Sequence, residues 1–450
     1  MFIHHGTGAN PSGGSISISF RARQARGHRV TRHMALTPKL GGIAVAMANR
    51  NYRIYTIGAI PSLMGTWVQR MAVGWLAWEL TGSGAWLGLI AFADLAPAVL
   101  SAPIAGAFAD RVDRLKAVRL VQYMSLLQAA TLATLTLSSV MTIELLFMLA
   151  LIQGIVQGIH QPFRHALLGT IVTRAEMTAA IGINSTIWNS SRLIGPAISA
   201  VVILQLGVGA TFLINALSYI PMLVGLYLIT AEHRPTTSKS LSQIPAEILE
   251  GIRYVTRHQF IGAVMFMLLM FSFFGRATQE LLPGFTGAVF NVGADGLALL
   301  TGAAGLGSLF SGVWLSRRGT LSGLSDIMIL MVALVAATQL AFVSTDIFWV
   351  SVAVFVGWGF VLNGSGIICQ SLVQATVPDT IRGRVVSLYG MLWLGTPALG
   401  AFAMGVAADY LGFRIPVAIG AVVILVTFAW SLARRRRLRE SIDAVAKEAT

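Results

Sequence analysis

The sequence has few charged residues and almost no cysteine. Only 11% of its 450 residues are charged and 55% are hydrophobic, whereas about a quarter of the residues of a soluble domain are charged. This composition, with a mean hydropathy of +0.74, excludes an ordinary soluble domain and predicts an integral membrane protein. The single cysteine, Cys369, lies in an apolar run, so an intramolecular disulfide is excluded.

Motifs for catalysis, nucleotide hydrolysis and metal binding are also missing. The sequence has no G-x-x-x-x-G-K-[ST] phosphate-binding loop and no His/Cys set with metal-ligand spacing, and His4 and His5 lie in a polar tail. We therefore expect no catalytic residue, no metal and no cofactor, and a chain that is not an enzyme. Without an ATPase motif, a transporter of this sequence must use an ion gradient or run downhill.

The net charge of +14 does not indicate a nucleic-acid partner. The basic residues lie in short clusters between apolar runs rather than along one polar face. Nearly all of the 32 Lys and Arg residues fall before the first apolar segment, in alternate connections, and after the last segment. This asymmetry predicts that both termini lie in the cytoplasm. We expect the chain to lie in the lipid bilayer of the cell (inner) membrane.

The sequence contains twelve long apolar segments. A membrane-spanning helix needs about 20 mostly apolar residues, because its backbone polar groups must be satisfied within the segment. The pattern thus predicts an all-α membrane protein with twelve transmembrane helices, which cover, to within a few residues, 53–80, 85–109, 115–137, 143–163, 178–206, 211–229, 260–285, 296–315, 324–342, 347–370, 385–406 and 415–432.

These segments divide the chain into two six-helix bundles, 51–230 and 260–436. Residues 1–50 are rich in Gly, Ser and Arg and predict a disordered basic tail, in which Met34 is a second candidate start. Residues 231–259 form a cytoplasmic linker and 437–450 a cytoplasmic tail. Within the linker, apolar residues at helical spacing predict an amphipathic surface helix: Leu241, Ile244, Ile248, Ile252 and Val255.

The two halves share an internal repeat. Sliding one half over the other gives matches at an offset of 205 or 206 residues, spread over four predicted helices. They are Arg70 with Arg276, Gly106 with Gly312, Arg111 with Arg317, Gln157-Gly158 with Asn363-Gly364, Trp188 with Trp393 and Gly195 with Gly400. A duplicated six-helix unit favours a substrate site near the midplane, between halves that rock about it.

The stretch "GAFADRVDRLK", residues 106–116, lies between the second and third segments. It resembles the G-x-x-x-D-R-x-x-R-[RK] signature of the major facilitator superfamily, in the same place. The block that begins "WVQRMAVGWLAWELTG", together with "VPDTIRGRVVSLYG", is similar to the exporter branch that includes the enterobactin exporter. The resemblance covers residues 51–437 and implies the major facilitator fold.

The resemblance also implies that this charged stretch is a cytoplasmic latch, formed by Gly106, Asp110, Arg111, Asp113, Arg114 and Lys116. Asp110 ends the second helix, where the helix dipole is already negative, so a positive partner is expected. The start of the eleventh helix, after Pro378 and Asp379, is a candidate, and Gly106 would let another helix come close. The alternative is a cluster that only fixes topology. Ser316 replaces the acid in the second half.

Ionisable side chains inside the predicted helices are costly in lipid and favour functional roles. Arg70 and Asp94 lie at similar depth on neighbouring antiparallel helices, which predicts an ion pair. Arg276 and Glu280, four residues apart on the seventh helix, can pair within that helix. These four residues are the candidates for ion coupling, with Asp94 the first choice and Glu280 the second; a purely structural pair is the alternative.

Further polar and aromatic side chains on the fourth, fifth, tenth and eleventh helices are candidates for lining a substrate cavity. They are Gln153, Gln157, Trp188, Asn189, Arg192, Trp358, Asn363 and Trp393. Interhelical hydrogen bonds and core packing are the alternatives. Gly195-Pro196 resembles the Gly-Pro motif on the fifth helix of antiporters of the superfamily, although the longer glycine pattern of that motif is absent.

We therefore expect a monomeric secondary active transporter that exports a small amphipathic or siderophore-like molecule by alternating access, with protons as the coupling ion. Two alternatives remain open. The chain could import a metabolite, or it could be a non-transporting membrane sensor on the same scaffold.

Overall fold

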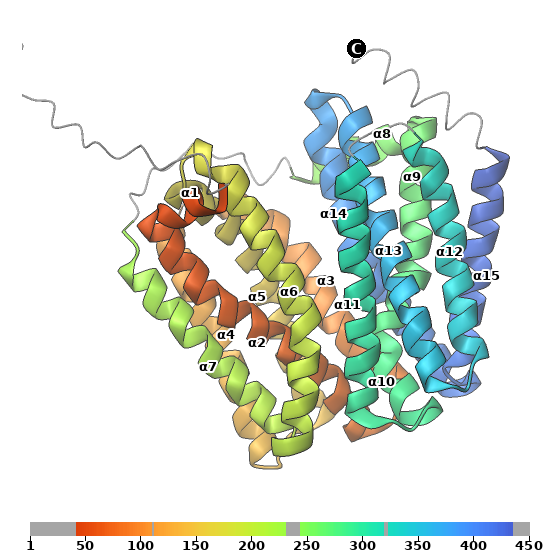
Figure 1. Ribbon diagram of the computed structural model, residues 1–450, viewed down its shortest axis with the longest axis horizontal. Coiled ribbons are helices and arrows are strands. Elements are labelled where there is room, and N and C mark those ends of the chain that lie inside the picture. Colours follow the sequence, from red (N-terminus) through yellow and green to blue (C-terminus); the bar gives the residue numbers. More distant parts are fainter. Residues whose placement is uncertain (1–41, 110–111, 231–243, 319–322, 435–450) are drawn as a thin grey trace, which may run out of the picture. The chain divides into compact units, whose positions relative to one another are not determined.

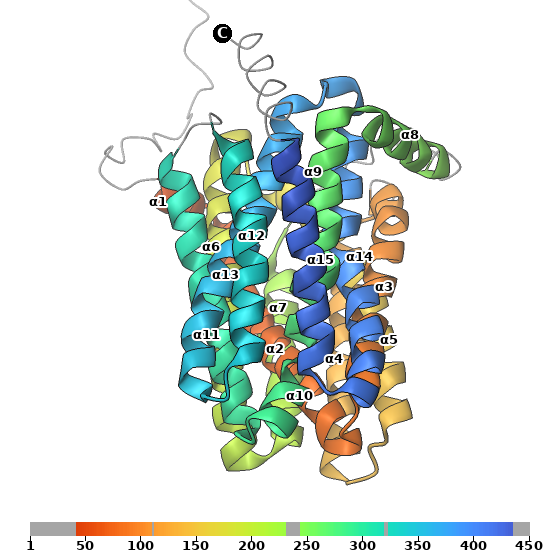
Figure 2. The ribbon, with the colours of Figure 1, turned by 90° about the vertical axis from the view of Figure 1, so that its right-hand side faces the viewer.

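The computed structural model describes residues 42–109, 112–230, 244–318 and 323–434, in which all the regular structure is helical. Figures 1 and 2 show the arrangement of these helices. In chain order they are α1 (Gly42–Ala48), α2 (Arg50–Thr81), α3 (Gly84–Ala109), α4 (Arg114–Leu137), α5 (Ile143–Ile171), α6 (Arg174–Leu206), α7 (Val208–Leu228), α8 (Ile244–Arg257), α9 (Gln259–Met270), η2 (Phe271–Gly275), η3 (Arg276–Leu281), α10 (Leu282–Gly284), η4 (Phe285–Val289), α11 (Gly293–Arg318), α12 (Leu324–Ser344), α13 (Phe348–Thr376), α14 (Asp379–Leu411) and α15 (Arg414–Ala433).

The predicted all-α fold is confirmed, and each of the twelve predicted segments is helical. Eleven helices of the described residues are long and apolar enough to cross a membrane, counting 259–289 as one. The remaining predicted span, α2, is 32 residues long but contains no stretch as apolar as those of the other eleven. Its polar side chains, among them Gln69 and Arg70, bind other helices rather than face lipid. Hydropathy alone therefore fails to identify α2 as a membrane span, although the helix is long enough to cross.

The packing of the helices repeats between the two halves, α2–α7 and α9–α15, which Figure 1 shows in warm and cool colours. Helix α3 packs on α5 as α11 packs on α13. Glycine is needed at two equivalent positions. A Cβ atom added at Gly195 would clash with the Trp67 side chain, and one added at Gly400 would clash with the Phe273 backbone. Trp67 and Phe273 are themselves 206 residues apart, so the repeat predicted from the sequence extends to a contact that the sequence analysis did not use.

The prediction of a disordered tail through residue 50 is wrong for residues 42–50, and residues 1–41 lie outside the described part. The apolar stretch of α1 packs against α6 and buries Ala46 completely. The Asn49 side chain caps α2 by accepting from two backbone N–H groups. Its Nδ2 donates to Glu176 Oε2 on α6 over 3.0 Å. Burial and capping together order this segment.

The linker helix α8 is present, as the spacing of its apolar residues predicts (Figure 2). Gly251 brings it against α14, and Glu250 Oε1 accepts from Arg384 Nη1 over 2.5 Å. Leu249 and Ile252 stay exposed. We call the end of the helices where α8 meets the start of α14 the α8 end, and the other the far end.

Candidate functional site

Arg70 of α2 is the centre of a group of charged side chains in the middle of the helices. Its Nη1 donates to Asp94 Oδ2 on α3 over 2.6 Å, and its Nη2 donates to Glu280 Oε1 on η3 over 2.9 Å. The Arg70 side chain is 33% exposed and each acid 20%. The predicted ion pair between Arg70 and Asp94 is therefore present, and a second acid, from the other half of the chain, shares the same guanidinium.

The helix that carries Glu280 is irregular along its central part. Residues Phe271–Gly275 form a π-helix, Arg276–Leu281 a 3₁₀-helix and Phe285–Val289 a second π-helix. Such breaks concentrate at functional sites, and discontinuous helices form the midplane sites of many transporters. The irregular segment thus falls on two of the predicted coupling residues.

The predicted pairing of Arg276 with Glu280 is wrong. In a 3₁₀-helix with 3.0 residues per turn, residues four apart point about 120° away from each other, rather than the roughly 40° of an α-helix. Glu280 consequently reaches Arg70, while the Arg276 guanidinium lies 4.4 Å from the centre of the Trp393 ring. Trp393 stacks in turn on Tyr389, with the ring planes 8° apart.

Arg192 of α6 lies near these groups without a partner. It forms no hydrogen bond or ion pair with the described residues, although its charge repels those of Arg70 and Arg276. Trp188, one turn earlier on α6, packs edge-on against Trp67 of α2, with ring centres 5.8 Å apart. The first half of the chain therefore presents a guanidinium and an indole to the same region.

The other predicted cavity residues are in varied places. Gln153 is buried, and its Oε1 has no partner in the described residues. Asn363 Nδ2 donates to the Ser308 backbone and to Ser311 Oγ, both over 3.2 Å, so it ties α13 to α11. Asn189 is exposed and donates to the Ser185 carbonyl on its own helix. Gln157 is half-buried.

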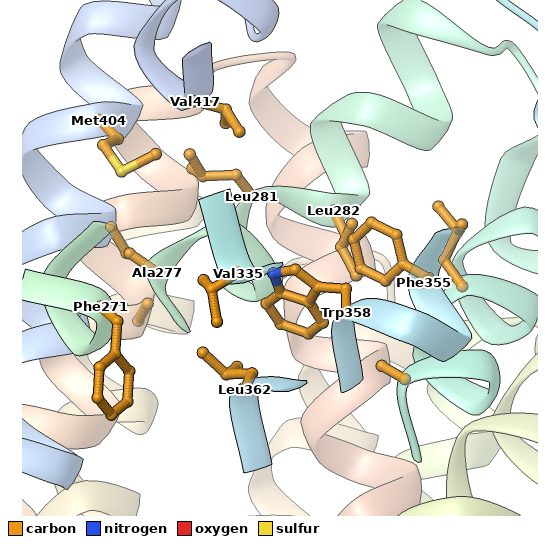
Figure 3. Close-up of a cluster of buried hydrophobic side chains, with 14 of the residues drawn as sticks. Phe271, Ala277, Leu281, Leu282, Val335, Phe355, Trp358, Leu362, Met404 and Val417 are labelled. Atoms are coloured by element: carbon orange, nitrogen blue, oxygen red, sulfur yellow. The ribbon is translucent and has the colours of Figure 1, made fainter. Parts of the chain in front are cut away.

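Trp358 belongs to the hydrophobic core, so its predicted place in a cavity is wrong. Its side chain is only 1% exposed and its ring lies 5.0 Å from that of Phe355. Figure 3 shows it next to Val335 and Leu362. The indole N–H has no partner in the described residues. Sequence could not separate this tryptophan from Trp188 and Trp393, because all three lie deep in apolar helices.

Two of the predicted latch residues, Asp110 and Arg111, lie outside the described residues. Asp113 caps α4 by accepting from the N–H groups of Leu115 and Lys116. Arg114 donates to Thr170 Oγ1 on α5 over 2.9 Å. A Cβ at Gly106 would have no described atom within 4 Å. No described helix lies close to Gly106 in this conformation, and the predicted role of Gly106 in a latch stays a prediction.

The two halves meet closely at the far end, along a seam between α3 and α14. A Cβ at Gly84 would lie 2.7 Å from the Gly405 carbonyl oxygen, and one at Gly88 2.6 Å from the Phe402 Cα atom. Small residues thus let the two helix backbones approach. The contact continues along the helices, since a Cβ at Gly395 of α14 would lie 3.4 Å from the Val99 side chain of α3, whereas a Cβ at Gly106 of α3 or at Gly390 of α14 would meet no described atom within 4 Å.

Asp409, at the end of α14, caps the start of α3 at this seam. Its carboxylate accepts from the Ser83 hydroxyl over 2.7 Å and from the backbone N–H groups of Gly84 and Ala85 over 2.5 and 3.2 Å. These N–H groups have no partner within their own helix, and the helix dipole favours an anion there. Sequence analysis missed Asp409; the signal was an acid at a helix end, as at Asp110.

Sequence analysis also missed a buried network of amides next to Arg70. Gln69 Nε2 donates to Gln128 Oε1 over 3.0 Å, and Asn215 Nδ2 donates to Gln69 Oε1 over 2.7 Å. Gln128 also donates to the Leu149 carbonyl on α5. The network joins α2, α4, α5 and α7, and so fixes the helix that carries Arg70. Single amides in otherwise apolar segments were the available signal.

Known proteins resemble this chain over nearly all of its length. The model of a family described as transmembrane secretion effector matches residues 43–449. The staphyloferrin A transporter of Staphylococcus aureus is 25% identical over 84% of this chain and 96% of its own length. The multidrug efflux pump Tap of Mycolicibacterium fortuitum is 24% identical, over 79% and 88%.

Solved structures show the same fold. A bacterial homologue of the iron transporter ferroportin, in an inward-facing state, superimposes with a TM-score of 0.62. The alignment covers 84% of this chain and 98% of that one, at 17% identity.

Thermal stability should show that the Arg70 guanidinium is shared by Asp94 and Glu280. Arg70→Gln removes the partner of two acids, whereas Asp94→Asn leaves Arg70 paired with Glu280 and should lower the midpoint of thermal unfolding in detergent less. A double-mutant cycle of these two changes should give a coupling of about 1–2 kcal/mol, within the range for residues in contact. The exposed pair of Arg414 and Asp346 is the control, with a coupling near zero. Additive effects of Arg70→Gln and Asp94→Asn would contradict the pair.

The seam should control the distance between the halves at the far end. Asp409→Asn weakens the cap of α3 by removing its charge, and Gly405→Val forces the helices apart. Spin labels on Val140→Cys and Val350→Cys, exposed residues of the two halves at this end, should therefore show a longer-distance population in both variants. Asp346→Asn, which removes an acid that pairs within one half, should leave the distances unchanged. Wild-type distances in both seam variants would refute this role.

Proposed function

We propose, on the premise that this chain belongs to the transmembrane secretion effector family of major facilitator transporters, that it exports a small amphipathic molecule in exchange for protons. The family and the curated relatives are transporters and not enzymes. The observation that carries the proposal is the ion pair between Arg70 and Glu280, which joins the two halves in the middle of the helices.

We take the α8 end to be cytoplasmic, since the basic connections of the sequence gather there. The seam held by Asp409 then closes the external face, and the conformation is one that opens toward the cytoplasm. Alternating access requires this seam to part while the opposite ends of α3 and α14 come together. The backbone-to-backbone approach of α3 and α14 at the far end, and the open positions at Gly106 and Gly390 toward the other end, support such a cycle.

The ion pairs suggest how this movement is coupled to protons. Arg70 and Asp94 lie on α2 and α3 of the same half and move together, whereas Glu280 lies on the other half. Parting of the seam draws Glu280 away from Arg70. A carboxylate in an apolar environment binds a proton more readily once its cation has left. Glu280 would load a proton from outside and lose it when Arg70 returns.

The relatives narrow the kind of substrate. One is named a staphyloferrin A transporter and another a multidrug efflux pump, so siderophores and drug-like amphiphiles form the first panel to test. Inside-out vesicles from cells that produce the protein should accumulate a member of this panel when a pH gradient is imposed. Accumulation only in right-side-out vesicles would favour an importer, and binding without movement would favour a sensor.

Coupling should depend on Glu280. In proteoliposomes, Glu280→Gln should still exchange substrate down its gradient but lose accumulation driven by a pH difference, because no group is left to carry the proton. Asp94→Asn should keep part of the accumulation, since its partner does not move away. Glu79→Gln, an exposed acid of α2, is the control and should behave as wild type. Full accumulation by Glu280→Gln would place the coupling site elsewhere.

Asp110 should act as a latch at the cytoplasmic face. Asp110→Asn removes a charge and keeps the shape of the side chain, so we expect transport to fall severalfold at unchanged membrane levels. Loss of one charged hydrogen bond shifts the equilibrium between conformations by about 1–3 kcal/mol. The readout is initial transport rate per protein in membranes. Unchanged transport would mean that the charged stretch only fixes topology.

A further inference from the structure

The charges around Arg70 do not balance. Three guanidinium groups, those of Arg70, Arg192 and Arg276, meet two carboxylates, those of Asp94 and Glu280. Both carboxylates bind the same guanidinium, Arg70. Arg192 and Arg276 form no ion pair with the described residues, although the charge of Glu280 attracts both and both lie in the middle of predicted membrane-spanning helices.

Arg276 is held in place with its donors unused. The Trp393 ring supports one face of its guanidinium at 4.4 Å, and the Tyr389 ring stacks on that of Trp393. The Tyr389 hydroxyl donates to the Gly366 carbonyl over 3.1 Å, which fixes the stack. The edge of the Arg276 guanidinium makes no hydrogen bond to the described residues. A rigid guanidinium with a free edge suits bidentate binding of an anion.

Arg192 approaches from the other half of the chain. It lies on α6, and its charge and that of Arg276 repel each other. Both side chains are half-buried, so they keep access to a small molecule. Two cations without ion pairs of their own are unfavourable in a membrane interior, and a bound anion would offset their repulsion. Trp393 and Trp188 add apolar surface to the same region.

We propose that the substrate is an organic anion, whose anionic group binds between Arg192 and Arg276 while its apolar part contacts Trp393. This inference rests on the proposed transport function and adds the charge of the substrate. Because the two arginines come from different halves, an anion between them would pull the halves together and favour their rocking motion. The negative charge of the proposed substrate distinguishes this chain from a pump for cationic drugs.

Binding to the purified protein tests the charge apart from transport. The probes are 4-phenylbutyrate, its neutral amide, the corresponding amine and phenylpropyl phosphonate, at millimolar concentration. We expect the two anions, and neither the amide nor the amine, to raise the thermal unfolding midpoint and to quench tryptophan fluorescence. Preference between the two anions distinguishes a carboxylate from a phosphonate site.

Substitutions of Arg192 and Arg276 test whether these two residues bind the anion. Arg192→Gln and Arg276→Gln should each weaken binding of the preferred anion about tenfold or more, the size of a charged hydrogen bond, and Arg276→Lys should restore part of it. Arg434→Gln is the matched control, because Arg434 lies 4.4 Å from the Trp430 ring but far along the chain from the other arginines. Without ligand, Arg192→Gln and Arg276→Gln should raise the unfolding midpoint, since each removes an unpaired charge.

Several results would overturn the inference. These are equal binding of the amide or amine, no binding of either anion, or unchanged affinity in both arginine variants. Anion binding without transport in proteoliposomes would instead contradict the proposed function and leave the site standing. Transport of a neutral or cationic compound without any anion binding would contradict the anion site and leave the proposed transport function standing.

Discussion

The arrangement depends on one guanidinium that serves two acids. Arg70 binds Asp94 within its own half and Glu280 across to the other half, and an unpaired charge inside the membrane would be costly. The buried amides of Gln69, Gln128 and Asn215 tie α2 to other helices of its own half. In the proposed cycle, movement between the halves would break the pair of Arg70 with Glu280.

The irregular helix around Glu280 makes the pairing of Glu280 with Arg70 possible. A regular α-helix would direct Arg276 and Glu280 to one face, where they would neutralise each other. The turn of 3₁₀-helix between two stretches of π-helix separates them, so that Glu280 meets Arg70 and Arg276 rests on Trp393. The backbone thus keeps a cation available that regular winding would have paired.

Sequence predicts the features that depend on distance along a helix. The twelve segments follow from the length of apolar runs, and the ion pair of Arg70 with Asp94 from equal depth on adjacent helices. The sequence marked Glu280 as a coupling candidate but could not predict that it pairs with Arg70, because the spacing rule assumes an α-helix that the chain does not form there. The sequence could not place Trp358 in the core either, since a tryptophan deep in an apolar helix gives the same sequence pattern whether it packs in the core or lines a cavity.

The far-end seam gives the predicted latch a counterpart on the same two helices. Helices α3 and α14 are antiparallel, and each is followed or ended by an acid where its dipole is negative, Asp110 after α3 and Asp409 in α14. Asp409 resolves its unfavourable position by capping the start of α3. If Asp110 caps the start of α14 in the same way, the two caps compete, because rocking halves cannot close both ends at once. Two equivalent caps then leave the conformations close in free energy, and the small differential binding of a proton or a substrate suffices to choose between them.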